Sequence, residues 1–401
     1  MNKFSRSKVG LVIIVVAVAL TAFSVGKGMA QGGSLERKLE TYLQVLQIVK
    51  SDYVEKNVDD QKLVYGSIRG LLDGLGDPYS RFMEPKSYKE MKMRLNGSYS
   101  GIGIYIGIKD KTLVVISPID DSPAKKLGVK AGDYIMKIEG KETKDMALEE
   151  AVSMIRGPQG TKVKLAIFRK NWKEAKDFNI TRKKIVIKST ASKMLGNNIA
   201  YIKLNTFENI NAAREFEKAL RKSKNADGLI LDVRGNGGGL LQNAIDIGSM
   251  FIRQGVIVQT VDREGRKEQL ESTGRVIWNK PVVMLINETS ASASEILAGA
   301  LRDHKVATLV GNHTFGKASV QNVRNLNDGS AVLITIAHYL TPNGEDINKK
   351  GISAEVVVTV PTKEAEELGI EMPEEAKDIQ LQKAEKILLE KIGREKNYGQ
   401  G

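Results

Sequence analysis

The sequence contains no cysteine, and this absence excludes disulfide bonds, a thiol nucleophile and cysteine-ligated metal. Histidine is nearly absent as well. His304, His313 and His338 are the only three, and none lies in a familiar motif for a histidine base. If the chain is a hydrolase, its general base is therefore expected to be another kind of side chain.

Aromatic residues are also few, at 5% of 401 residues, although basic residues outnumber acidic ones by 61 to 48. Such a charge excess can indicate nucleic-acid binding, which usually also requires clustered basic residues and aromatic stacking surfaces. Here the basic residues are scattered, and the short runs at 182–184 and 349–350 are not interleaved with aromatics. We therefore expect no nucleic-acid partner. The chain length allows two or three domains.

Long hydrophobic runs are missing except at the N-terminus. Residues 9–26 carry no charge, and Lys3, Arg6 and Lys8 precede them. This pattern predicts a signal peptide or a membrane anchor over residues 1–30, with Gly28-Met29-Ala30 as a passable cleavage site. Either alternative exports the remainder, so we expect a secreted or membrane-anchored, extracytoplasmic protein.

Helical patterns flank the centre of the chain. Leu39, Leu43, Leu46 and Val49 recur at spacings of three and four, which predicts a helix over residues 35–73 within an N-terminal helical segment, 34–96. At the other end, residues 361–401 are charged and helical in pattern, with one apolar stripe. A stripe of this kind suits docking onto another domain or dimer contact, and we expect a homodimer.

Residues 97–184 have the pattern of a β-rich domain. Residues 101–108 alternate small and branched side chains, as a strand does. Ser122 and Pro123 are typical of a helix start, and Gly128 of its end. With the Gly-Val-Lys-Ala-Gly-Asp run at 128–133, this segment resembles a PDZ domain. The resemblance implies that Gly101, Ile102, Gly103 and Ile104 form the loop that binds a peptide C-terminus. A glycine cluster without a ligand is the alternative.

Strands alternate with helices over residues 185–360. Residues 228–233 and 281–286 are short apolar runs without polar interruption, as expected for strands buried on both faces. Residues 212–222 and 293–303 have helical patterns. We therefore predict a layered α/β core domain over 185–360.

Ser292 lies between a predicted buried strand and a predicted helix, in a run of small residues. A hydroxyl there can point into a cleft, beside the free N–H groups of a helix N-terminus. Ser292 and Glu295 also fit a capping box, in which the serine has only a structural role. On local sequence alone, Ser290 and Ser294 are also candidates for the nucleophile.

Lys317 makes the catalytic interpretation more attractive. Its neighbours in sequence are apolar or small, and burial destabilises an ammonium ion so that the free amine can act as a base. A strand over residues 318–323 would place Lys317, Ser319 and Gln321 on one face, where Gln321 can hold the amine by a hydrogen bond. A solvated lysine at a loop end remains the alternative.

The glycine-rich loop at 234–239 is a candidate oxyanion site. Backbone N–H groups of Gly237, Gly238 and Ala293 can stabilise the negative charge of a tetrahedral intermediate. Residues 311–317 also match the start of a phosphate-binding loop, but Ala318 replaces the serine or threonine that binds magnesium. A trypsin-like Ser-His-Asp protease with a PDZ domain is disfavoured because no suitable serine, histidine and aspartate contexts are present.

Six motifs in order make the chain resemble the carboxy-terminal processing proteases, the tail-specific serine peptidases of family S41. The motifs are the run at 76–80, the PDZ elements within 101–133, and the runs at 232–239, 290–295, 314–321 and 339–344. The resemblance implies a multidomain α/β protein with a ClpP/crotonase-like protease core, a PDZ domain and helical terminal segments. It implies Ser292 as nucleophile, Lys317 as base with Gln321 beside it, and Gly237, Gly238 and Ala293 as oxyanion donors. It assigns supporting positions to Glu295, Asp303 and Thr314.

From these observations we predict a serine endopeptidase with a Ser/Lys catalytic centre, which needs no metal or cofactor. Its expected partners are protein or peptide substrates with apolar C-termini, captured by the PDZ domain. Arg156, in the turn after a predicted PDZ helix, is a candidate regulatory residue that can reach the protease core. Two other function classes stay open: a PDZ scaffold with an inactive core, and a crotonase-like acyl enzyme.

Overall fold

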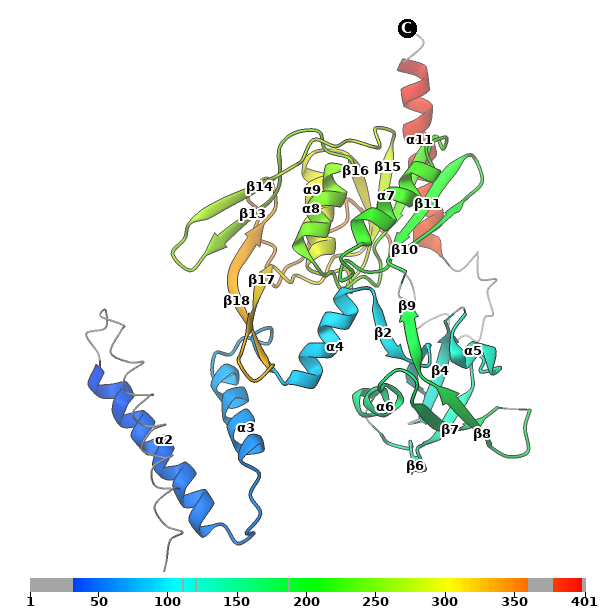
Figure 1. Ribbon diagram of the computed structural model, residues 1–401. Helices are drawn as coiled ribbons and strands as arrows, with labels where there is room; N and C mark the ends of the chain where they lie inside the picture. Colours follow the sequence, from blue (N-terminus) through cyan, green and yellow to red (C-terminus); the bar gives the residue numbers. More distant parts are fainter. Residues whose placement is uncertain are drawn as a thin grey trace, which may run out of the picture. The chain divides into compact units, whose positions relative to one another are not determined.

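The computed structural model describes residues 32–109, 112–119, 121–146, 148–169, 171–186, 188–359 and 378–398 (Figure 1). The described residues up to Ser67 and those from Ile68 onwards form two compact units. The predicted signal peptide or anchor at 1–30 lies outside the described residues. Within the described ranges, no helix combines the length and the apolar character needed to cross a membrane.

The first unit contains α2 (Gly32–Asp52) and the start of α3 (Asp60–Asp73). The continuous helix expected over 35–73 is therefore wrong, because residues 53–59 are not helical. Asp59 ends the interruption by accepting a hydrogen bond from the Lys62 N–H at 3.1 Å, which caps a new helix. Leu35, Leu39 and Leu43 on α2 are about half exposed, at 50%, 47% and 52%.

A short connecting region leads from α3 into the β-rich domain. It comprises β1 (Arg81–Met83), α4 (Pro85–Leu95) and β2 (Ser98–Gly101). Strand β2 pairs antiparallel with β9 (Lys183–Val186), so the segments entering and leaving the β-rich domain form one two-stranded ribbon.

The β-rich domain between these two strands has its own sheet and its own core. Its strands are β3 (Ile104–Lys109), β4 (Thr112–Pro118), β5 (Tyr134–Ile138), β6 (Lys141–Glu142), β7 (Lys162–Phe168) and β8 (Lys176–Thr181). Helices α5 (Pro123–Lys126) and α6 (Leu148–Ile155) complete it. The predicted cap of α5 is confirmed, since Ser122 Oγ accepts from the Lys125 N–H at 3.2 Å.

The α/β core is built on a second, largely parallel sheet, coloured green to orange in Figure 1. Its order is β10 (Thr190–Met194), β11 (Ile199–Leu204), β12 (Gly228–Asp232), β15 (Val282–Ile286), β16 (Ala307–Gly311) and β19 (Val356–Val357). Every residue of β12 and β15 is buried, which confirms the sequence prediction of strands covered on both faces.

Alternate residues of these strands face two different helical layers. Leu229 and Leu231 pack into the cluster that includes residues of α7 (Ala212–Lys222), α8 (Leu241–Ser249) and α9 (Ala293–Asp303). Ile230 packs into a separate cluster with Leu388 of α11 (Ile379–Tyr398). The period-two alternation of a strand therefore explains both layers.

A third sheet borders the site region. Its order is β1, β18 (Ala331–Leu340), β13 (Val256–Asp262) and β14 (Lys267–Glu271), and β17 (Ser319–Asn325) also pairs with β18. Strand β1 pairs with β18 in the register Phe82↔Val332. This pairing brings the turn at residues 77–80 beside the strands that follow Lys317.

Candidate active site

Ser292 is the residue that precedes α9, and its backbone is strained. It has φ 56° and ψ −115°, a combination that non-glycine residues rarely adopt. Such strain concentrates at functional sites, where the surrounding structure holds it in place. Ser292 is only half buried. The strained turn therefore places this serine where a ligand can reach it.

The neighbouring serines have structural roles. Ser290 Oγ donates to the Val233 carbonyl at 2.9 Å, and Ser294 Oγ donates to the Asn236 carbonyl at 2.8 Å. Both residues are fully buried. These hydrogen bonds tie the serine turn to the end of β12 and the loop after it. Of the three candidates, Ser292 is the one that the geometry leaves accessible.

Glu295 joins the serine turn to the lysine segment. Its Oε2 accepts from the Ser292 N–H at 2.8 Å and from the Lys317 N–H at 2.9 Å. Its Oε1 accepts from the Gly316 N–H at 2.7 Å and from Thr314 Oγ1 at 2.6 Å. One oxygen thus binds the amides of both Ser292 and Lys317, so the two backbones lie within two hydrogen-bond lengths of each other. The glutamate half of the predicted capping box is present, but this carboxylate also organises the lysine segment.

Tyr339, which the sequence did not single out by itself, makes a second link between these residues. Its hydroxyl donates to the Ser292 carbonyl at 3.2 Å and also to the Lys317 carbonyl. Burial and the nearby Glu295 carboxylate raise the pKa of Tyr339 well above its usual value, so it stays a donor. The Tyr-Leu-Thr-Pro-Asn-Gly run was the available sequence signal.

Lys317 has an environment suited to a base. Burial lowers the pKa of its ammonium group, and the positive charge of Arg81 lowers it further. The carboxylates of Asp77, Glu208 and Glu295 act in the opposite direction without reversing the shift. Its Nζ lies 4.6 Å from the centre of the Tyr79 ring. Lysine at this place is thus half buried and easier to deprotonate than in water.

The turn at residues 77–80 positions that ring. Asp77 Oδ1 accepts from the Tyr79 N–H at 3.0 Å, and Asp77 Oδ2 accepts from Ser80 Oγ at 2.6 Å. Burial raises the pKa of Asp77, but the hydrogen bonds outweigh burial and the net shift is downward. Ser80 Oγ in turn accepts from the Thr335 N–H of β18 at 3.0 Å. Sequence reasoning identified this motif only as part of a resemblance and gave it no role.

Gln321 does not contact Lys317 in the way that the strand pattern suggested. Its Nε2 donates to Ser319 Oγ at 2.8 Å and to Thr335 Oγ1 at 3.2 Å. The strand itself begins at Ser319, and its register with β18 shifts between Val320 and Gln321. An irregularity of this kind redirects side chains and is not visible in residue spacing.

The glycine loop lies against Ser292. A Cβ atom on Gly238 would lie 2.5 Å from the Ala291 carbonyl and 2.8 Å from Ser292 Cβ, and Gly238 has φ 93°. Only glycine fits there. The Gly238 N–H donates to Asn236 Oδ1 at 2.9 Å in this conformation. Gly237 and Ala293 are the other two candidate donors, and Ala293 is the first residue of α9, where N–H groups have no intrahelical acceptor.

The two remaining supporting residues hold the surroundings of the site. Thr314 is fully buried, and its Oγ1 accepts from the Ile352 N–H at 2.7 Å while donating to Glu295. Asp303, at the end of α9, accepts from the Asn343 N–H at 3.0 Å and pairs with Arg302 at 2.8 Å. These contacts fix the lysine segment and the run at 339–344 to the same helix.

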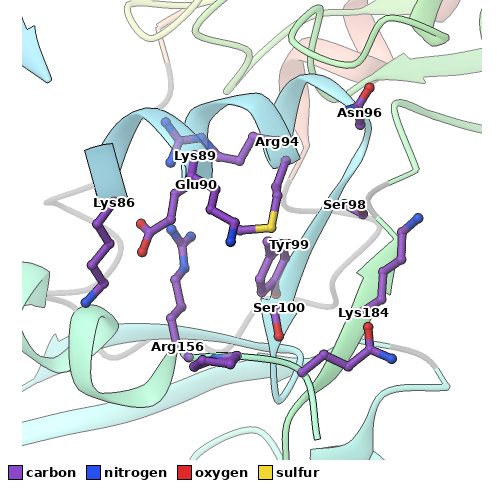
Figure 2. Close-up of a pocket in the computed structure, with 14 residues that line it drawn as sticks. Lys86, Lys89, Glu90, Arg94, Asn96, Ser98, Tyr99, Ser100, Arg156 and Lys184 are labelled. Atoms are coloured by element: carbon purple, nitrogen blue, oxygen red, sulfur yellow. The ribbon is translucent and has the colours of Figure 1, made fainter. Parts of the chain in front are cut away.

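The predicted peptide-binding loop lies between β2 and β3. Ile102 is 1% exposed, and Gly103 has φ 76° with no room for a Cβ beside Ser122. Arg156 follows α6 and stacks on the Tyr99 ring at 5.1 Å. Figure 2 shows the Arg156 side chain extending from its turn towards α4. The buried Arg182 holds this turn, because it donates to the Ile155 and Met154 carbonyls at the end of α6.

Comparisons with known proteins agree with this architecture. The model of peptidase family S41 matches residues 198–358, the PDZ domain model matches residues 90–168, and a model of the activating protease CtpB N-terminal domain matches residues 19–87. The carboxy-terminal processing protease CtpA of Bacillus subtilis (strain 168) is 39% identical over 88% of this chain and 76% of its own length. The carboxyl-terminal-processing protease of Synechocystis sp. is 37% identical over 78% of this chain and 75% of its own.

A solved structure supports the same assignment. The photosystem II D1 C-terminal processing protease superposes with a TM-score of 0.54 at 32% identity, covering 83% of this chain and 89% of that one. The chain is therefore a peptidase with an α/β core and a PDZ domain. It belongs to peptidase family S41, among the carboxy-terminal processing proteases, and the fold class predicted from the sequence is confirmed.

Proposed function

We propose that this peptidase cleaves protein substrates with a Ser292/Lys317 centre after its PDZ domain has captured their C-termini. The observation that carries the proposal is the shared Glu295 oxygen, which holds the Ser292 and Lys317 backbones together. The lowered pKa of Lys317, caused first by burial and then by Arg81, supports its role as the base.

In the first step, the free amine of Lys317 takes the proton of Ser292 Oγ as this oxygen attacks the substrate carbonyl carbon. The carbonyl oxygen becomes an oxyanion, which Gly237 and Ala293 N–H groups can stabilise. Gly238 can join them once its N–H is released from Asn236. The C–N bond then breaks, and the leaving amine takes the proton from the Lys317 ammonium.

The second step removes the acyl group from Ser292. Lys317, again a free amine, takes a proton from water as the water oxygen attacks the ester carbonyl. Collapse of the second oxyanion breaks the bond to Ser292 Oγ, which regains the proton from Lys317. The products are a new C-terminal carboxylate and the free serine, and neither step requires a metal or cofactor.

Gln321 acts in this scheme as a positioning residue whose amide can hold the neutral Lys317 amine. Its present hydrogen bonds go to side chains only, that of Ser319 on the same strand β17 and that of Thr335 on the adjacent strand β18, so a rotamer change is enough to redirect it. In this conformation the Gln321 amide is therefore bonded to Ser319 and Thr335 and does not hold the Lys317 amine.

Substrate capture rests on the loop at residues 101–104. A peptide added as a strand beside β3 would bring its terminal carboxylate to the backbone of this loop. An apolar last residue suits the largely apolar core beside Ile102. Binding there can reposition Arg156, which reaches towards α4, and so influence the arrangement of Lys317 and Gln321.

We also propose that the protein is exported and that it forms a homodimer. Export follows from the charge and hydropathy pattern of residues 1–30. Homodimerisation follows from the half-exposed apolar side chains of α2, since a stripe of this kind is usually covered by a partner. Light scattering of the full chain and of a Leu39→Glu variant tests the dimer.

The function is tested by digestion of an unfolded protein with an apolar C-terminus. We expect wild type to cleave it, and Ser292→Ala and Lys317→Met to lose at least about a thousandfold in kcat/KM while remaining folded. Lys267→Met, on the exposed strand β14, is the matched control and should keep full activity. If Ser292→Ala and Lys317→Met cleave the substrate as fast as wild type does, the catalytic assignment is wrong. Turnover of acyl-CoA instead of protein would favour a crotonase-like enzyme.

A further inference from the structure

A pocket of about 560 Å³ lies between α4, the ribbon of β2 and β9, and the turn after α6 (Figure 2). Its walls carry an excess of positive charge. The cationic side chains lining it are Lys86, Lys89, Arg94, Arg156 and Lys184, and Glu90 is the one carboxylate among its lining residues.

Most of this positive charge is not neutralised. Arg94 has Glu208 at 3.8 Å, which is at the limit of an ion pair. Within the part of the chain that the structure describes, Lys86, Lys89 and Lys184 make no ion pair. Like charges gathered around one concave surface repel each other and attract an anion. The pocket is therefore electrostatically suited to negatively charged groups.

A second, independent feature points to a ligand. Ser100 lines the pocket, and its buried Oγ has no hydrogen-bond partner among the residues that the structure describes. A buried hydroxyl in this state costs free energy unless something binds to it. Ser100 can donate to an oxygen atom of a bound group, which matches the charge of the surrounding side chains.

The pocket adjoins the predicted peptide-binding loop. Ser98, Tyr99 and Ser100 form part of its wall, and Gly101, the first residue of that loop, follows directly. A polypeptide whose terminus occupies the loop would therefore bring its last residues next to the pocket. A substrate tail is favoured over a lipid surface as the ligand, because the pocket wall continues directly into the predicted peptide-binding loop. A peptide bound in that loop would place its acidic side chains near the pocket.

We propose that the pocket binds acidic side chains near the C-terminus of the substrate, so that preferred tails carry aspartate or glutamate beside their apolar end. The inference rests on the proposed PDZ capture and adds a second determinant of substrate choice. Lys86 and Lys89 from α4, with Arg156 from the PDZ turn, are the specificity-determining groups. Because these side chains are largely in contact with solvent, the selectivity should weaken as salt is added.

Binding of two fluorescent peptides to the full-length Ser292→Ala protein tests the proposal. Both end in the same apolar residues, and they differ only in two glutamates replaced by glutamine. We expect the acidic peptide to bind about five- to twentyfold more tightly at low salt, as for one or two exposed ion pairs. This advantage should disappear in Lys86→Gln/Lys89→Gln and persist in Lys218→Gln/Lys222→Gln, which removes equal charge from exposed positions on α7.

The outcomes separate this inference from the function it rests on. If the Ser292→Ala protein with Lys86 and Lys89 unchanged binds the two peptides equally, the acidic preference is overturned and PDZ capture stays intact. Absence of binding by either peptide overturns both. An acidic advantage that survives Lys86→Gln/Lys89→Gln overturns the assignment to this pocket. Equal peptide binding together with anionic vesicle binding that is lost in Lys86→Gln/Lys89→Gln would assign the pocket to a lipid headgroup instead.

Discussion

A lysine acts as a base near neutral pH only if its ammonium ion is less stable than in water. Lys317 meets this condition through burial and through the positive charge of Arg81, against three carboxylates that favour protonation. Sequence reasoning found the lysine from its apolar neighbours. It could not find Arg81, because that residue reaches the site through the pairing of β1 with β18.

Two exposed charges should move the pH dependence of kcat/KM in opposite directions. Arg81→Gln removes a positive charge, which raises the pKa of Lys317 and shifts the acidic limb of the profile to higher pH. Glu208→Gln removes a negative charge and shifts that limb to lower pH. Rates measured from pH 5 to 10 check both, with Arg324→Gln as an exposed control. Shifts of the same sign in both variants would contradict the assignment of Lys317 as the titrating base.

Glu295 should be essential for stability as well as for activity. Its two oxygens accept four hydrogen bonds, and a glutamine has one oxygen and an NH₂ group that would face donors. We expect Glu295→Gln to lower the free energy of unfolding by about 2–5 kcal/mol. Denaturant unfolding measures this, and the exposed Glu150→Gln should change it by less than about 0.5 kcal/mol. An unchanged unfolding midpoint for Glu295→Gln would contradict this role.

The helices and strands of the core could largely be predicted from residue periodicity. The apolar runs at 228–233 and 281–286 are buried strands, and the patterns at 212–222 and 293–303 are helices. Two features were missed for physical reasons. The break at 53–59 depends on the Asp59 cap, and the orientation of Gln321 depends on an irregular register with β18. Periodicity reports which face is buried and carries no information about either.

The glycine loop gives a prediction with an internal control. Gly238→Ala places a methyl group against the Ala291 carbonyl at a positive φ, so it should disturb the Ser292 turn and destabilise the protein by about 1–3 kcal/mol or more. A Cβ on Gly237 meets nothing within 4 Å, and Gly237→Ala should keep its unfolding free energy within about 1 kcal/mol. Thermal unfolding compares the two. Equal stability would mean that the loop does not pack against Ser292 as described.

The C-terminal helix links distant parts of the chain to the central sheet. Leu388 and Ile392 of α11 pack with Ile230 and Val283, and they lie so close to β12 that a Cβ on Gly228 would be 2.9 Å from Leu388. Arg234, in the candidate oxyanion loop, pairs with Asp378 at 2.7 Å just before this helix. The apolar stripe predicted from the sequence therefore docks onto the core. The strands that it contacts, β12 and β15, could not be predicted from the stripe alone.

Adjacent leucines on α11 test this docking. Leu388 is fully buried, and Leu388→Ala should lower the free energy of unfolding by about 2–5 kcal/mol through lost burial and a cavity. Leu389 is 38% exposed, and Leu389→Ala should cost less than about 1.5 kcal/mol. Urea titration of both variants measures the difference. If Leu389→Ala costs as much as Leu388→Ala, the helix does not dock by the described face.

The pH dependence of Ser292 phosphonylation by a fluorophosphonate probe, in which the serine oxygen displaces fluoride from phosphorus, tests the central assignment most directly, because it reports the serine nucleophile without a bound polypeptide. We predict labelling that rises with pH through a pKa below the usual lysine value of 10.5, and that falls at least about a hundredfold in Lys317→Met. Mass spectrometry should place the label on Ser292. Labelling of Lys317→Met at the wild-type rate, or of another serine, would contradict a lysine base acting on this hydroxyl.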